Sequence, residues 1–60
     1  MADRELTVDE KTGTLLQHKY QGFGARILQT EAGGYIVYDY LEERNKFVPY
    51  SEVGNWYVIE

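Results

Sequence analysis

The chain of 60 residues contains no cysteine, one proline, one methionine, one tryptophan and one histidine. Without thiols it has no disulfide, no thiolate metal ligand and no cysteine nucleophile, so we expect the fold to depend on packing alone or on self-association. No apolar run approaches the roughly 20 residues that a membrane span needs. The charged start MADRELTVDE lacks the apolar core of a secretory signal. These absences predict a cytoplasmic protein without a membrane segment.

Positive charge is also scarce in this sequence. Ten acidic residues face six basic ones, which gives a formal net charge of −4. Phosphate binding relies on clustered Lys and Arg. The basic residues here are scattered along the chain: Arg4, Lys11, Lys19, Arg26, Arg44 and Lys46. The charge balance therefore disfavours a nucleic-acid partner.

The length predicts a single small β domain that spans residues 1–60. A chain of this size buries only roughly 60% of its unfolded surface, which leaves little room for a deep active site. We expect residues 1–5 to be disordered. In an alternative interpretation the disordered segment extends to about residue 12, because the composition there is polar.

Glycines and polar clusters separate short segments that favour β-structure. The expected elements are a hairpin over Leu6–Tyr20 that turns at residues 9–13, a bend or bulge at 20–24, strands at 25–30, 35–41, 46–50 and 56–60, and one 3₁₀ turn at 51–55. The paired Gly33 and Gly34 predict a tight turn between antiparallel neighbours. We therefore predict an all-β, single-domain fold, either an SH3-like barrel or a strongly twisted antiparallel meander of five to six short strands.

Two strings resemble segments of eukaryotic SH3 domains, which bind proline-rich peptides in an aromatic groove. VYDY at residues 37–40 is similar to the ALYDY segment, and VPYSEV at 48–53 is similar to the terminal PxxY turn. The order of these features differs from the family. The YDY segment opens an SH3 domain and a tryptophan precedes the proline, whereas here only 20 residues follow Tyr40 and Trp56 comes after Pro49. We interpret the match as one of composition.

Residues that carry catalytic chemistry are sparse. His18 is the single histidine and has no cysteine, serine or carboxylate at a spacing that makes it a metal ligand or a member of a triad. The pairs Asp9-Glu10 and Glu42-Glu43 fall in expected turns, where solvation is their ordinary role. Gly22-Phe23-Gly24 lacks the third glycine of a phosphate loop. We predict no enzyme activity, no cofactor, no metal site and no small-molecule substrate.

Aromatic residues are the strongest signal, because seven of them lie in the last 26 residues: Tyr35, Tyr38, Tyr40, Phe47, Tyr50, Trp56 and Tyr57. Alternation along the strands puts bulky side chains on both faces, more than a core built on Ile27, Val37, Leu41, Val48 and Val58 or Ile59 can hold. The surplus predicts an exposed Tyr/Trp patch with an acidic rim. Its expected partner-binding residues are Tyr38, Asp39, Tyr40, Tyr50 and Trp56, with Asp39 either an ordinary strand residue or a selector of a partner's cationic side chain.

The sequence therefore favours a non-enzymatic protein-interaction module, a small regulator or inhibitor that binds a larger protein or a second copy of itself. One alternative is single-stranded nucleic-acid binding on an aromatic sheet, with Arg26, Arg44 and Lys46 holding the backbone. Another is mimicry of nucleic-acid charge by acidic residues, namely Glu31, Asp39, Glu42, Glu43 and Glu52.

Overall fold

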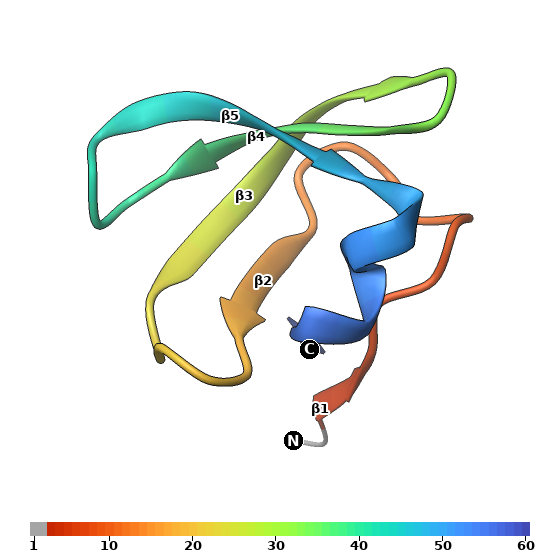
Figure 1. The fold of residues 1–60 in the computed structure, drawn as a ribbon. Helices are drawn as coiled ribbons and strands as arrows, with labels where there is room; N and C mark the ends of the chain where they lie inside the picture. The colour runs from red at the N-terminus through yellow and green to blue at the C-terminus, as the bar shows by residue number, and fades with distance from the viewer. Residues whose placement is uncertain (1–2) are drawn as a thin grey trace.

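The computed structural model describes residues 3–60 as one curved antiparallel sheet with a single short 3₁₀ helix (Figure 1). The elements are β1 (Asp3–Glu5), β2 (Leu15–His18), β3 (Gly24–Glu31), β4 (Gly34–Asp39), β5 (Arg44–Pro49), the 3₁₀ helix η1 (Tyr50–Asn55) and β6 (Trp56–Ile59). Residues 1 and 2, part of the segment expected to be disordered, lie outside the described residues. Asp3–Glu5 form a strand.

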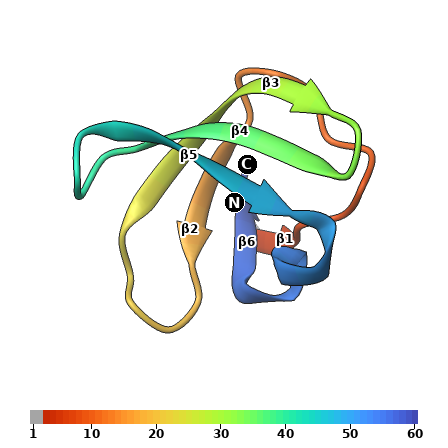
Figure 2. The ribbon, with the colours of Figure 1, turned by 45° about the horizontal axis from the view of Figure 1, so that its top comes forward.

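The strands follow the order β1-β6-β2-β3-β4-β5, and the sheet is open, with β1 and β5 at its edges. Consecutive antiparallel pairs connect β2 to β5, and η1 then returns the chain so that β6 pairs with both β2 and β1. Figure 2 shows β5 and η1 folding over one side of the sheet. This arrangement confirms the predicted all-β fold as a twisted meander of six short strands.

The expected hairpin over Leu6–Tyr20 is wrong, because β6 lies between β1 and β2 in the sheet. Leu6 is buried at 4% exposure, and its N–H donates to the carbonyl of Trp56 at 3.3 Å. Gly13 does take a positive φ of 86°, but its N–H binds the carbonyl of Ile27 on β3 at 2.7 Å. β1 and β2 both pair with β6 from the carboxyl end of the chain, which is why sequence proximity misleads here.

The carboxyl-terminal half follows the predicted pattern closely. A two-residue turn, Ala32 and Gly33, joins β3 to β4, and Gly33 has a φ of 86°. Pro49 is the last residue of β5 and precedes η1, which covers the segment expected to hold a 3₁₀ turn. Proline at this point fits its lack of an N–H donor.

One face of the sheet, here the inner face, holds the core. Its buried side chains are Leu6, Leu16, Ala25, Ile27, Tyr35, Val37, Val48, Trp56 and Val58. Leu41 was expected in this set, but it is 64% exposed because β4 ends at Asp39 and the chain turns over residues 40–43. Val58, and not the half-buried Ile59, is the core residue of β6.

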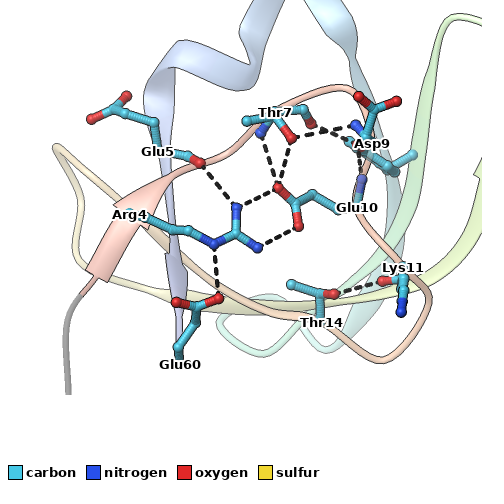
Figure 3. A network of polar contacts seen from close by, with 9 residues as sticks. Arg4, Glu5, Thr7, Asp9, Glu10, Lys11, Thr14 and Glu60 are labelled. Carbon is cyan, nitrogen blue, oxygen red and sulfur yellow. Dashed lines mark hydrogen bonds and ion pairs between the residues drawn. The ribbon is translucent and has the colours of Figure 1, made fainter.

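An ion-pair network fastens the amino-terminal segment to the sheet (Figure 3). The Arg4 guanidinium donates to both carboxylate oxygens of Glu10 at 2.7 and 2.8 Å, and to Glu60 at 2.8 Å. The hydroxyl of Thr7 donates to the same Glu10 carboxylate at 2.8 Å. These contacts, led by the bond from Arg4, lower the pKa of Glu10 to about 2. The network gives the long loop before β2 a fixed path.

Candidate functional site

The sheet divides the five residues that the sequence predicted as one binding patch. Tyr38 and Tyr40 lie on the outer face, opposite the core. Asp39 and Trp56 lie on the inner face at 1% and 6% exposure, and Tyr50 packs against the core. The prediction of a single exposed patch of all five residues is therefore wrong. Neighbouring residues on β4 alternate between the two faces, and Trp56, which pairs with His18, belongs to the inner face.

The outer face nevertheless carries the surplus of rings that the sequence indicated. Side chains paired across the strands place one continuous group there: Leu15, Ile36, Tyr38, Tyr40, Phe47, Tyr57 and Ile59, with Leu28 at a bulge of β3. Of these, Leu28, Tyr40, Phe47 and Tyr57 are 45%, 48%, 51% and 36% exposed. We refer to this set, together with Arg26, as the outer face.

Arg26 lies in the middle of the outer face and is held in place by neutral partners. It pairs in register with Tyr38, and its Nε donates to the hydroxyl of Tyr40 at 3.1 Å. Its Nη1 donates to the carbonyl of Gly13 at 2.8 Å. Tyr38 and Tyr40 pack edge to face with centroids 5.2 Å apart. Within residues 3–60 no carboxylate lies within ion-pair distance of Arg26, so its charge is uncompensated on this face.

A second candidate site is a pocket of about 320 Å³ at the end of the inner face where the β2–β3 and β4–β5 turns lie. We refer to it as the end pocket. It is lined by His18, Gln21, Phe23, Val37, Asp39, Glu42, Lys46, Phe47, Val48, Glu52 and Trp56. Two of the predicted site residues, Asp39 and Trp56, therefore do lie at one site, although it is a pocket and not a flat patch.

Three rings form one wall of the end pocket. His18 stacks on Phe23 with centroids 5.0 Å apart and an interplanar angle of 15°. Trp56 stands perpendicular to both, at 4.9 Å from His18 and 5.4 Å from Phe23. The Nδ1 of His18 accepts hydrogen bonds from the backbone N–H groups of Tyr20 and Gln21 at 3.3 and 3.2 Å. These bonds hold the ring against the β2–β3 turn.

Charged groups also line the end pocket. Asp39 Oδ1 accepts from the N–H groups of Leu41 and Glu42 at 2.8 and 3.0 Å, while Oδ2 lies 3.0 Å from Lys46 Nζ. Burial alone would raise the pKa of Asp39, but these hydrogen bonds and the ammonium hold it below its usual value. Lys46 Nζ also lies 2.9 Å from Glu42, and the pKa of Lys46 is raised by both carboxylates. Asp39 thus organises the β4–β5 turn.

Sequence reasoning missed His18 and Phe23 as site residues and considered Lys46 only for nucleic-acid binding. The signal for His18 was available. It lies two positions after the buried Leu16 on β2, so the two side chains share the inner face. Phe23 precedes β3, where alternation gives no information, and only the turn that places it against His18 reveals its role.

Among residues 3–60, no group of three or more His, Asp or Glu side chains is arranged to hold a metal ion. No helix within the same residues is long and apolar enough to cross a membrane. No protein-family model, no curated protein and no solved structure matches this chain.

Proposed function

We propose that this chain is a non-enzymatic protein-interaction module, and that its outer face is the surface that the partner covers. The observation that carries the proposal is the continuous group of exposed rings and aliphatic side chains on a face that no other segment of residues 3–60 covers. A role as a small cytoplasmic regulator or inhibitor of a larger protein belongs to the same proposal. So does its classification as SH3-like, which the open sheet leaves undecided.

The expected partner surface is apolar with a carboxylate at its centre. Tyr40 and Phe47 supply apolar contact area, and Tyr38 adds a hydroxyl to a rigid ring, which is the composition that interface centres favour. Arg26 lacks an ion pair within residues 3–60, and its guanidinium has donors left for a partner's Asp or Glu. Because this charge is already oriented by Tyr40 and Gly13, a partner carboxylate would meet a preorganised donor.

The geometry does not favour either nucleic-acid hypothesis as a second candidate. Arg26 lies on the outer face, whereas Lys46 is turned inward and paired with Asp39 and Glu42. The three cations expected to hold a nucleic-acid backbone therefore form no continuous track along the tyrosines. For charge mimicry, Asp39 is buried and paired, so it cannot present a phosphate-like charge.

The proposal is tested by comparing what the wild type and surface variants capture from a lysate, followed by binding with the purified partner. A Tyr40→Ser, Phe47→Ser variant should lose the captured protein. Tyr20→Ser is the matched control, because Tyr20 is 76% exposed but lies in the β2–β3 turn. With purified partner, Arg26→Gln should weaken binding about tenfold, as expected for a lost charged hydrogen bond. Thermal melts establish that each variant remains folded.

Three outcomes would overturn the proposal. The first is recovery of the same proteins by the wild type and the double variant. The second is a concentration-dependent dimer that the double variant abolishes, since a second copy would then cover the face. The third is salt-dependent binding of a labelled single-stranded oligonucleotide that Arg26→Gln removes, which would favour the nucleic-acid hypothesis.

A further inference from the structure

The end pocket lies on the opposite side of the sheet from the outer face and has a different chemical character. Its volume of about 320 Å³ is at the small end of ligand pockets and suits a single long side chain. Aromatic rings and charged groups both line it, so a fitting occupant carries an apolar stem and a polar head.

The net charge of the pocket determines whether the polar group of an occupant is a cation or an anion. Three carboxylates, Asp39, Glu42 and Glu52, line it against the single ammonium of Lys46, which leaves two negative charges in excess. An anion is therefore repelled, whereas a cation gains both from the carboxylates and from the faces of nearby rings.

The three carboxylates are not equally available. Asp39 is saturated by two backbone N–H groups and Lys46, and Glu42 is shared between Lys46 and Arg44. Glu52, on η1, makes no ion pair within residues 3–60. Among residues 3–60 it is the lining carboxylate that no cation pairs with. Lys46 is held by Asp39 and Glu42, which leaves Glu52 for an incoming cation.

We propose that the end pocket binds an alkylammonium group, the side chain of a lysine on a partner protein, with its stem against Trp56 and Phe23 and its head at Glu52. The pocket is preorganised for this, because the three rings contact one another and His18 is anchored to the β2–β3 turn. Phe47 is the one residue that the outer face and the pocket lining share, so variants at the other residues test the two proposals separately.

The direct test titrates the folded protein with Nα-acetyl-lysine methylamide and with the norleucine analogue, which has a similar stem without the charge. Trp56 is the single tryptophan of the chain, so its emission reports on this pocket alone. The lysine probe should give a saturable change in Trp56 emission and shift the NMR signals of His18 and Phe23. The norleucine probe should bind at least tenfold more weakly.

Two substitutions test the role of charge, one that removes a negative charge from the pocket and one that removes a positive charge. Glu52→Gln should weaken binding of the lysine probe about two- to fivefold, as an exposed ion pair predicts. Lys46→Gln should tighten it by a similar factor, because it removes the competing ammonium. Tyr40→Ser, an outer-face substitution at a residue that does not line the pocket, should bind the probe as the wild type does, which separates this site from the outer face.

Several results would overturn the assignment. Equal binding of the lysine and norleucine probes would show an apolar site, and no saturable change with either would show no site. If an arginine probe binds more tightly than the lysine probe, the ligand group is a guanidinium and not an ammonium. If spermidine binds far more tightly than the lysine probe, the ligand is a free polyamine. An unchanged affinity in both Glu52→Gln and Lys46→Gln would remove the electrostatic basis.

Discussion

The phenol of Tyr35 donates a 2.6 Å hydrogen bond to the carbonyl of Thr7, which lies 28 positions earlier in the chain. The same oxygen accepts a hydrogen bond from the N–H of Glu10 at 3.0 Å. Tyr35 is fully buried, and burial is the main cause that raises its pKa. One hydroxyl from β4 therefore satisfies two backbone groups of the loop before β2.

Replacing Tyr35 by Phe should destabilise the domain by about 1–3 kcal/mol, because the N–H of Glu10 and the carbonyl of Thr7 lose their buried partner while the ring stays packed. Urea denaturation would measure the change in the free energy of unfolding. Tyr20→Phe is the control, since that hydroxyl lies in an exposed turn. Equal stability of Tyr35→Phe and the wild type would show that water replaces the phenol.

Stability should fall at acidic pH through the Arg4–Glu10 pair. The pKa of Glu10 is about 2 in the folded chain against an ordinary 4.5. A depressed folded-state pKa contributes stability that is fully present above pH 4.5 and is lost as the pH falls toward 2. Because Arg4 is partly exposed and solvent screens the pair, we expect Glu10 to contribute about 1 kcal/mol.

The measurement for this pair is the free energy of unfolding between pH 2 and pH 7 for the wild type and Glu10→Gln. Asp39 and Glu42 also have lowered pKa values, so part of the acid dependence will remain in the variant. Glu52→Gln is the control substitution, because Glu52 makes no ion pair within residues 3–60. If Glu10→Gln and the wild type lose stability in parallel, the network contributes nothing through titration.

The sequence predicts the β3–β4–β5 region well because each signal there is local. The glycine pair sets one turn, Pro49 marks the end of β5, and alternation along YIVYDYL correctly separates Tyr38 from Tyr35 and Val37. The prediction for the amino-terminal half fails because its contacts join segments that are far apart in the sequence. The pairing of β1 with β6 and the bond from Tyr35 to Thr7 both join segments that no local pattern connects.

The candidate site shows the same limit. The inference that the chain has more ring volume than its core can hold agrees with the exposed rings on the outer face. The grouping of Tyr38 with Trp56 was wrong because the alternation of one strand says nothing about which face a distant strand shares. His18, Phe23 and Trp56 meet only because β6 pairs with β2, a register that the sequence does not encode locally.

Gly34 should tolerate no side chain, for a reason different from that of its neighbour Gly33. Its φ is not positive, but an added Cβ would lie 2.4 Å from the carbonyl of Val48 and 2.6 Å from the ring of Phe47. Gly34→Ala should therefore lower the free energy of unfolding by about 1–3 kcal/mol. Gly54→Ala is the control, since nothing lies within 4 Å of its added Cβ and its φ is not positive. Equal melting temperatures of the two variants would contradict this reading of the β4–β5 contact.

Glu43 is the one non-glycine residue with a positive φ among residues 3–60, at 57° in the β4–β5 turn. The left-handed conformation costs an L-residue roughly 1 kcal/mol, and glycine adopts it freely. Glu43→Gly should therefore raise the free energy of unfolding by about 0.5–1 kcal/mol, measured by thermal and urea denaturation. Glu42→Gly, the adjacent position, should have the opposite sign, because Glu42 has no positive φ and pairs with Lys46 and Arg44. A loss of stability in Glu43→Gly would mean that the greater freedom of glycine in the unfolded chain outweighs the relief of strain.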